Sequence, residues 1–242
     1  TTVVAVDGDK TIMLGTNGIS GYDDSTNSYD YIYFGNWEAL DKYTTTGPIK
    51  WRVLSVEEDG TALLLADKLL DMQPFDKNGK IDWEECTLRT WLNSTFLNAA
   101  FTEAEQEAIA ETELETESAA TVTDNIYLLS LEEVSNPEYG FHPLIDCESN
   151  TRKAEGTDLS VFNNIWWLRT PHKEEHASWV YSIDSQGTNR IIVVGAENSL
   201  WIRPALRLKL SDRAHWSYAG TTASEELEVT VENPTAGSLF SG

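Results

Sequence analysis

Two short segments that place an arginine among large apolar side chains constrain this chain more than any other feature. One reads Trp-Trp-Leu-Arg-Thr-Pro at residues 166–171, and the other reads Trp-Ile-Arg-Pro-Ala-Leu-Arg-Leu at residues 201–208. An unpaired buried guanidinium is very costly, so each segment predicts a buried arginine with carboxylate or carbonyl partners. A proline follows each arginine closely, lacks the N–H of a strand ladder, and is expected to end the pairing. The predicted structural clamp consists of Trp166, Trp167, Arg169 and Arg203.

Apolar residues that alternate with polar ones predict a chain built mostly of strands. The expected strands are residues 3–6, 11–14, 29–37, 49–56, 61–66, 126–129, 165–169, 178–183, 191–194 and 202–210. The last four are separated by turn residues and predict a meander, with residues 172–201 presented between the two arginine segments.

Apolar residues at helical spacing predict a few short helices in the N-terminal half. The expected helices are residues 88–99, residues 102–110 and a brief third helix capped by Ser130. Asp82 is expected to cap the first, and Thr102 with Glu105 forms a capping box for the second. Residues 111–124 are acidic and aperiodic and predict a loop. Together these patterns predict an α+β fold with antiparallel sheets.

One main domain is expected over residues 29–215. Residues 1–28 would add one or two strands and a polar segment packed on that domain. Residues 216–242 are small and polar and predict a tail with a possible strand at residues 227–231. The nine tryptophans, nine tyrosines and seven phenylalanines suffice for a sizeable core in a chain of 242 residues.

The charge balance restricts the class of partner. The chain has 17 basic and 40 acidic residues, a net charge of −23. Nucleic acid and anionic membrane surfaces are therefore not expected partners. The acidic surface favours solvation, with a role in binding a cation or a cationic partner as the alternative. No apolar run is long enough for a transmembrane segment.

The two cysteines, Cys86 and Cys147, are too few for a disulfide framework or a structural zinc site. Whether they form one disulfide depends on their separation, so both alternatives remain open. The chain begins at Thr1 rather than at a methionine, which agrees with a trimmed leader and a secreted protein.

Several ordered motifs resemble one protein family. Tyr-Ile-Tyr-Phe-Gly-Asn-Trp at residues 31–37, Ile-Lys-Trp-Arg-Val-Leu at 49–54 and Cys-Thr-Leu-Arg-Thr-Trp-Leu-Asn at 86–93 precede the two arginine segments. Together they resemble the DUF6273 family over residues 29–210. The resemblance implies an exported protein or lipoprotein at the cell surface, of a kind found mostly in gut Firmicutes, without an assigned activity.

The two arginine segments also resemble the end of the C-type lectin-like fold of formylglycine-generating enzymes and of variable proteins from diversity-generating retroelements. That resemblance implies a compact α+β domain whose last strands and loops display ligand-contacting residues. The enzymes need a cysteine-based metal site in the C-terminal region, and both cysteines here precede the arginine segments. DUF6273 members often fill the intervening segment with Asn, Ser, Gly and Tyr. Here residues 172–176 are charged and residues 191–194 apolar, so a shared binding property does not follow.

A short motif after Pro74 resembles the calcium loop of an EF-hand, with Gly79 at the sixth position. Pro74 stands at the first position and offers no side-chain oxygen, and the preceding residues predict a strand rather than the incoming helix. The candidate calcium ligands are Asp76, Asn78, Asp82 and Glu85. A glycine turn followed by a helix cap is the simpler interpretation, with a calcium site as the alternative and no other cofactor expected.

His172 and His176 lie four residues apart, with carboxylates between them. On a helix they would share one face, as in zinc-dependent hydrolases. Pro171 and the flanking strand patterns favour an exposed loop instead, with opportunistic metal binding as the alternative. The sequence contains no nucleophile elbow, no phosphate-binding loop and no dinucleotide fingerprint, so no catalytic residue is assigned.

Aromatic and amide side chains between the two arginine segments are the candidate ligand contacts. Alternation places Trp179, Tyr181 and Ile183 on one face, which favours a core role for that set and leaves the loop residues as better contacts. The candidate ligand-binding residues are Trp179, Gln186, Asn189, Arg190, Asn198 and Trp201.

The sequence therefore predicts a monomeric, exported, non-catalytic binding module, extracellular or attached to the cell envelope. It would present its C-terminal loops to a glycan or protein ligand at the bacterial cell surface. Two alternatives stay open: a carboxylate-dependent hydrolase of envelope or dietary polymers, and a purely structural domain of a larger surface protein.

Overall fold

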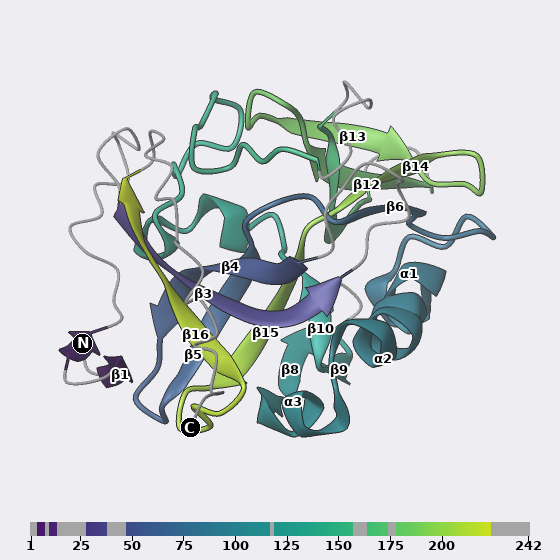
Figure 1. The fold of residues 1–242 in the computed structure, drawn as a ribbon. Helices are drawn as coiled ribbons and strands as arrows, with labels where there is room; N and C mark the ends of the chain where they lie inside the picture. The colour runs from purple at the N-terminus through teal and green to yellow at the C-terminus, as the bar shows by residue number, and fades with distance from the viewer. Residues whose placement is uncertain are drawn as a thin grey trace, which may run out of the picture.

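Two β-sheets of unequal size make up most of the structure (Figure 1). It is a computed structural model that describes residues 4–7, 10–13, 28–37, 47–116, 119–156, 164–173 and 178–223. The strands pair antiparallel with one exception, and a few short helices accompany them, which confirms the predicted α+β class. None of the described helices is long and apolar enough to cross a bilayer.

The seven-stranded sheet holds the centre of the core. In spatial order its strands are β10 (Ile126–Leu128), β15 (Pro204–Lys209), β5 (Thr61–Ala66), β4 (Gly47–Val56), β3 (Ser28–Trp37) and β16 (Trp216–Ala223), and β7 (Ile109–Ala110) also pairs with β15. Every residue of β5 is buried, as its unbroken run of apolar and small side chains predicts for a central strand.

The five-stranded sheet lies at the top of Figure 1 and comes mainly from the C-terminal half. Its strands in order are β13 (Asn189–Val193), β12 (Trp179–Ile183), β11 (Trp166–His172), β14 (Ser199–Ile202) and β6 (Asp71–Pro74). β11, β12 and β13 form three strands of the predicted four-stranded meander. The fourth does not follow β13 in the sheet, because β14 pairs in parallel with β11 at Trp166 and Trp201. Two separate hairpins complete the strands: β1 (Val4–Asp7) with β2 (Lys10–Met13), and β8 (Thr112–Glu115) with β9 (Thr121–Asp124).

A run of short helices follows β6, and aromatic side chains from this run contact β3. The helices are η2 (Trp83–Glu85), α1 (Thr87–Trp91), the π-helical turn η3 (Leu92–Phe96), α2 (Leu97–Ala100) and α3 (Glu103–Ala108). Two further helical turns, η4 (Glu133–Ser135) and η5 (Pro137–Tyr139), come later in the chain. Ring centroids lie 5.0 Å apart for Phe34 and Phe101, and 4.7 Å apart for Trp37 and Phe96. Such pairs bury large apolar areas, so this helical segment covers part of β3.

The two main helical segments are capped differently. At α3 the predicted capping box is present: Glu105 Oε2 accepts the Thr102 N–H at 2.8 Å, and Thr102 Oγ1 accepts the Glu105 N–H at 3.3 Å. At α1 the cap is Cys86, whose Sγ accepts the Arg89 N–H at 3.4 Å, and not the predicted Asp82. A thiol is a weak acceptor and is not among the preferred N-cap residues, so the sequence rule missed it.

Two segments predicted to lack regular structure are strands. Residues 111–124, expected to form a loop, contain the β8–β9 hairpin, in which Thr112 and Leu114 are buried between exposed glutamates. The segment after residue 215, expected to be a tail, begins with β16, which pairs with β3 at the edge of the larger sheet. The possible strand at residues 227–231 lies outside the described residues.

Pro171 does not end strand pairing as predicted, whereas the ladder of β14 does end just before Arg203 and Pro204. β11 continues to His172, and Pro171 lies opposite Val180 after a bulge that absorbs its missing N–H. The strand expected at residues 202–210 is split, because β14 ends in the five-stranded sheet and β15 begins at Pro204 in the seven-stranded sheet. Arg203 is therefore the residue at which the chain crosses between the sheets.

Candidate functional site

Arg203 is fully buried where the two sheets meet. Its Nε donates to the Ala66 carbonyl at 2.8 Å, and its Nη1 donates to the Arg152 carbonyl at 3.2 Å. The guanidinium lies over the Trp166 ring, 5.2 Å from the centroid. Burial and the nearby Arg52 guanidinium lower the pKa of Arg203. Arg203 thus has the burial and the carbonyl partners that the sequence predicts, and it holds β5 and β11 beside the crossing point.

Arg169 joins the two sheets at a second point and is mostly buried. Its Nη1 donates to the Leu128 carbonyl at 2.8 Å and pairs with the Glu133 carboxylate. Its backbone N–H donates to the Leu129 carbonyl at 3.0 Å, and the guanidinium lies 5.7 Å from the Tyr127 ring centroid. Since Leu128 belongs to β10, these contacts tie β11 to the edge of the larger sheet.

A turn organised by Asp184 joins β12 to β13. Asp184 Oδ1 accepts the backbone N–H of Gln186 at 2.9 Å and that of Thr188 at 3.0 Å. Asp184 Oδ2 accepts Nε–H of Arg190 at 2.8 Å. One carboxylate therefore fixes both the backbone of the turn and the exposed arginine that follows it.

The irregular segment after η5 holds this turn from the other side. The Ser149 N–H donates to the Gln186 carbonyl at 3.1 Å, and a Cβ at Gly187 would lie only 2.1 Å from the Ser149 oxygen. Gly187 has φ +78°, which a residue with a side chain rarely adopts. The fully buried guanidinium of Arg152 donates to five carbonyls, those of Val134, His142, Leu144, Cys147 and Gly187. The turn is thus anchored to the interior.

The outward face of β11, β12 and β13 carries aromatic and apolar side chains. Trp179 lies opposite His172 and Val193, and Tyr181 lies opposite Ile191. The His172 ring centroid is 5.2 Å from that of Tyr181 and 6.2 Å from that of Trp179. Ile191 is 37% exposed and Val193 is 45% exposed. We call these five residues the outer patch.

For most of β12, the face that is buried is not the face that the sequence predicted to be buried. Val180 and Ser182 are fully buried, whereas Trp179 and Tyr181, expected to be core, are only half-buried. Ile183, the third residue of the predicted core set, is buried. Alternation identified the two faces correctly but assigned the wrong one to the core for most of the strand.

The structure separates the six candidate ligand-binding residues. Those at the Asp184 end of the hairpin are Gln186, Asn189 and Arg190. Trp179 and Asn198 lie at the other end, where Asn198 Nδ2 donates to the Val193 carbonyl at 3.0 Å. A strand of this length puts the two ends about 13 Å apart. Trp201 is 2% exposed within β14, too deeply buried for a ligand to contact.

The calcium-like motif forms a turn in which backbone N–H groups hydrogen-bond to the carboxylate of Asp76. Asp76 Oδ2 accepts the N–H groups of Asn78 and Lys80 at 2.6 and 2.9 Å, and Oδ1 accepts that of Thr87 at 2.8 Å. Glu85 pairs with Lys80. Within the described ranges, no three His, Cys, Asp or Glu side chains lie close enough to hold a metal ion. This geometry fits the interpretation as a glycine turn followed by a helix start.

The remaining candidates are the two histidines of the possible metal site and the two cysteines. His172 ends β11, and His176 lies outside the described residues, so the two-histidine metal site stays untested. Cys86 and Cys147 are both free thiols. Burial raises the pKa of Cys86 to about 12, so its thiol is protonated and unreactive at neutral pH.

A small pocket beside Arg169 bears on the hydrolase alternative. Two carboxylate residues, Asp82 and Glu115, line it, and its volume is about 30 Å³. That volume corresponds to roughly one water molecule. A pocket of this size cannot hold a sugar unit between two carboxylates, so it gives that alternative no support.

Sequence reasoning missed Arg152 and Asp184 as organising residues. Asp184 carried a usable signal, because Asp-Ser-Gln-Gly between two strands is typical of a turn whose aspartate bonds to its own backbone. Arg152 carried none, because it lies in an irregular stretch and its hydrogen-bond partners come from as far as 51 residues away.

The comparisons with known proteins bear on the family of the chain. The family model described as a domain of unknown function, DUF6273, matches residues 59–210. No curated protein and no solved structure matches the chain. The matched range begins later than residue 29, where the motifs placed its start, but it contains both arginine segments, the outer patch and the Asp184 turn. Because the model covers more than half of the chain, this protein belongs to the DUF6273 family.

Proposed function

We propose that this chain is an exported, non-catalytic binding module whose outer patch contacts a glycan or protein ligand at the bacterial cell surface. Its place outside the cell, either free or attached to the envelope, follows from the family resemblance. Aromatic rings suit such a role because they offer a large, rigid contact area at a small cost in conformational entropy.

The outer patch is the observation that carries the proposal. The His172 ring contacts the rings of Trp179 and Tyr181, and all three side chains are only half-buried. Only three large apolar side chains are exposed in the described part of the chain, and two of them, Ile191 and Val193, belong to this patch. Apolar side chains gathered on a surface commonly mark an interaction site.

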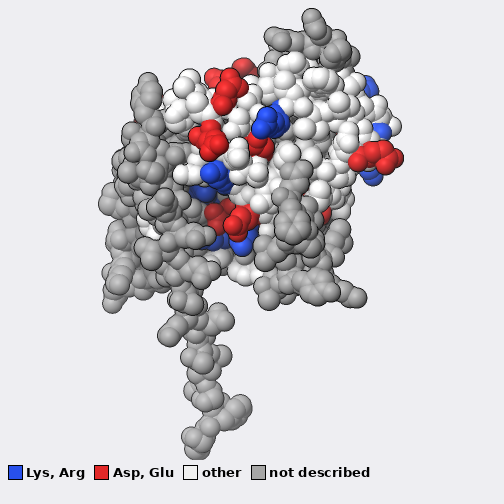
Figure 2. Space-filling model, turned by 90° about the horizontal axis from the view of Figure 1, so that it is seen from above, with Lys and Arg blue, Asp and Glu red and all other residues white. Residues whose placement is uncertain are grey.

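The Asp184 turn supports the proposal through its rigidity. Its backbone is fixed by Asp184 from within and by Ser149 and Arg152 from the interior. A surface ordered before binding loses less conformational entropy when a ligand binds. Figure 2, seen from above Figure 1, shows acidic and basic side chains interspersed among uncharged ones, so the acidic excess does not form one uniform field there.

We also propose that the domain has a C-type lectin-like fold. The antiparallel sheets, the short helices and the display of the last strands on a separate small sheet all agree with it. An experimental structure tests this point, and a strand order that cannot be superposed on lectin-like domains would contradict it.

The binding proposal is tested with panels of purified glycans and purified envelope and host-surface proteins. The variants are Trp179→Ala, Tyr181→Ala and, as a matched control, Leu144→Ala, which shortens an exposed apolar side chain outside the patch. We expect each patch variant to weaken binding about tenfold or more, since aromatic anchors dominate such contacts, and the control to have little effect. A triple change of Gln186, Asn189 and Arg190 shows whether the other end of the hairpin contributes. Binding at background, or equal in all variants, would refute the proposal.

A further inference from the structure

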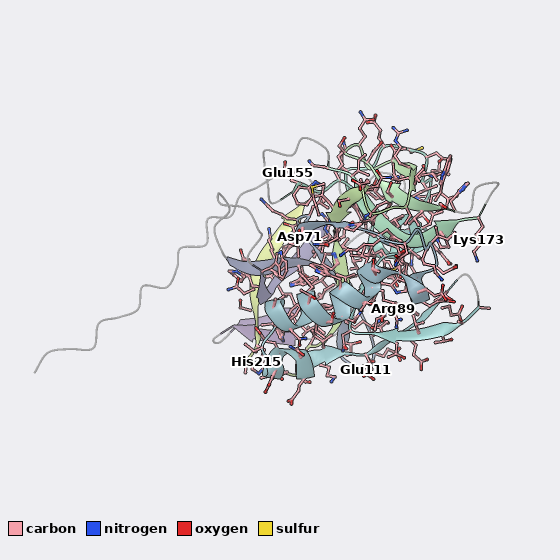
Figure 3. All side chains as sticks on the ribbon, turned by 90° about the vertical axis from the view of Figure 1, so that its right-hand side faces the viewer. Asp71, Arg89, Glu111, Glu155, Lys173 and His215 are labelled. Carbon is pink, nitrogen blue, oxygen red and sulfur yellow. The ribbon has the colours of Figure 1, made fainter. Side chains whose placement is uncertain are left out.

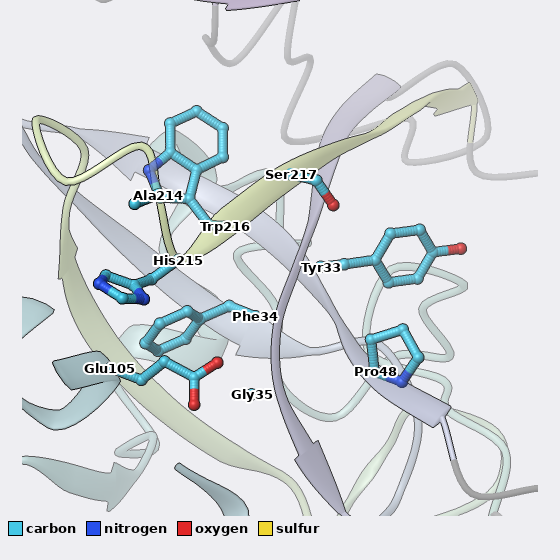
Figure 4. A pocket seen from close by; sticks show the side chains of 9 residues that line it. All are labelled: Tyr33, Phe34, Gly35, Pro48, Glu105, Ala214, His215, Trp216 and Ser217. Atoms are coloured by element: carbon cyan, nitrogen blue, oxygen red, sulfur yellow. The ribbon is translucent and has the colours of Figure 1, made fainter. Parts of the chain in front are cut away.

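A pocket of about 290 Å³ opens far from the outer patch. Figure 3 places Lys173, which follows the patch residue His172, and His215, which lines the pocket, on opposite sides of the molecule. The pocket lies among β3, β4, α3 and the start of β16 (Figure 4). Its volume lies near the lower end of the range of small-molecule sites.

A β-bulge builds the floor of this pocket. The register between β3 and β4 shifts after Tyr33, and Gly35 has φ +67°. A Cβ at Gly35 would lie 2.3 Å from the Phe101 ring, and the Phe34 carbonyl accepts Nε1–H of Trp51 at 2.8 Å. The core thus fixes this stretch of backbone. Bulges often lie beside binding sites because they redirect side chains.

One side of the pocket is acidic. Glu105 Oε2 accepts hydrogen bonds from Thr102 N and Oγ1 at 2.8 and 2.9 Å, and Oε1 has no hydrogen-bond partner in the described part of the chain. Nε2 of His215 lies 3.7 Å from a carboxylate oxygen of Asp212. None of the described residues that line the pocket is Lys or Arg.

The rest of the lining is largely aromatic and apolar. Figure 4 shows Glu105 and His215 beside the Phe34 ring, with Tyr33 and Pro48 on the opposite side of the pocket. Trp216, from the strand that pairs with β3, adds a third aromatic ring. The Phe34 ring is 1% exposed and backs the pocket, whereas the Tyr33 and Trp216 rings are only half-buried. A carboxylate and accessible aromatic rings in one pocket both favour a cation, through the negative charge and through the negative faces of the rings.

We propose that this pocket binds an organic cation, a primary ammonium or guanidinium group on a short apolar stem. The cationic group contacts the Glu105 carboxylate, and the stem lies against the half-buried Tyr33 and Trp216 rings and Pro48. The net charge of −23 attracts such a ligand and repels an anion of the same size. The same chemistry occurs in free amines and in the Lys and Arg side chains of peptides. The site goes beyond the proposed function and does not depend on it.

The test is isothermal titration calorimetry of the whole chain with agmatine, pentylamine, the neutral analogue pentan-1-ol, and a blocked Ala-Lys-Ala peptide. We expect Glu105→Gln to weaken cation binding about tenfold or more, the effect of removing a hydrogen bond between charged groups. This variant keeps its fold because glutamine also completes a capping box. Glu107→Gln removes an equal charge from an exposed position on the same helix and is expected to change the affinity less than about twofold, since solvent screens it.

The outcomes distinguish a free amine from a basic side chain of a peptide as the ligand, and they also show whether the proposal itself fails. Binding of the free amines identifies a small-molecule site, and binding of the peptide alone identifies a basic side chain of a protein partner. A shift of the Trp216 indole N–H signal on titration, assigned with Trp216→Phe, locates either ligand in this pocket. The proposal is overturned if no cation binds, if pentan-1-ol binds as well as pentylamine, or if the two glutamine variants behave alike.

Discussion

Arg203 and Arg169 both join the two sheets, but their electrostatic surroundings differ. Arg169 lies near the surface, and its guanidinium faces the Glu133 carboxylate. Arg203 is fully buried and bonds only to carbonyls, and its Nη2 has no hydrogen-bond partner among the described residues. The two arginine segments look alike in sequence, yet of these two arginines only Arg169 has a carboxylate in direct contact among the described residues, whereas Asp67 acts on Arg203 without a direct ion pair.

The difference indicates two roles. A guanidinium paired with a carboxylate near solvent keeps part of its hydration and adds modest stability. A buried guanidinium bound only by carbonyls has lost its hydration without gaining a directly bonded carboxylate, so its net stabilisation relative to an apolar residue is small. Removing it still leaves buried carbonyls unpaired. We infer that Arg203 chiefly specifies where the chain crosses between the sheets, whereas Arg169 stabilises their contact.

The largest effect is expected for Arg203→Ala. This change leaves the Ala66 and Arg152 carbonyls without their donor and opens a cavity beside Trp166. We expect the free energy of unfolding to fall by about 3–5 kcal/mol, measured by urea denaturation followed through tryptophan fluorescence. Arg203→Met fills most of the cavity and separates the packing loss from the hydrogen-bond loss. A fall of less than about 1 kcal/mol in Arg203→Ala would contradict the specifying role.

A smaller effect is expected for Arg169→Ala. It removes one hydrogen bond to the Leu128 carbonyl and one ion pair with Glu133, and solvent reaches part of the side chain. The expected loss is about 1.5–3 kcal/mol, the value of hydrogen bonds that involve a charged group. Glu133→Gln and the double variant complete a cycle that isolates the ion pair, for which we expect a coupling of about 1 kcal/mol. Coupling near zero would show that Arg169 acts through the carbonyl alone.

The sequence predicted local structure well where one short-range rule decided it. The Thr102 capping box, the strands at residues 49–56 and 61–66, and the need of Arg203 for partners all follow from nearby residues. The predictions failed where distant contacts decided the outcome. Pro171 stays in a strand because a bulge accommodates it, and β16 exists because β3 offers it an edge. Neither partner is visible in the local pattern.

The candidate site shows the same limit. Alternation in β12 indicated two faces, but burial of Val180 and Ser182 depends on what lies beneath the sheet, which periodicity does not contain. Trp201 is buried with its ring packed against Gly156, a contact that its local pattern does not reveal, so its aromatic character did not make it a ligand contact. The turn residues were identified more easily, since aspartate and glycine act there on their own backbone.

The smallest effect concerns Asp71, a second buried charge on the Arg203 side of the contact. It pairs in register with Ile202, the residue before Arg203. Its Oδ1 accepts the Met72 N–H at 2.6 Å, its Oδ2 is buried without a hydrogen bond of good geometry in the described ranges, and the Gln73 side chain acts on the carboxylate only weakly compared with burial. Burial raises the pKa of Asp71 above its ordinary value. The native state therefore binds this proton more tightly than the unfolded chain does, and stability falls as pH rises from about 4 through the raised pKa.

Asp71→Asn tests whether this charge, like that of Arg203, lacks an oppositely charged group in direct contact. The neutral amide removes the cost of burying a carboxylate, so we expect a gain of about 1 kcal/mol in the free energy of unfolding at pH 7. The gain should disappear near pH 4, where Asp71 itself becomes protonated, and urea denaturation at both pH values measures the difference. A loss of stability at pH 7 would mean that the carboxylate has a cationic partner. In that case the contrast between the Arg203 and Arg169 sides would not extend beyond the two arginines.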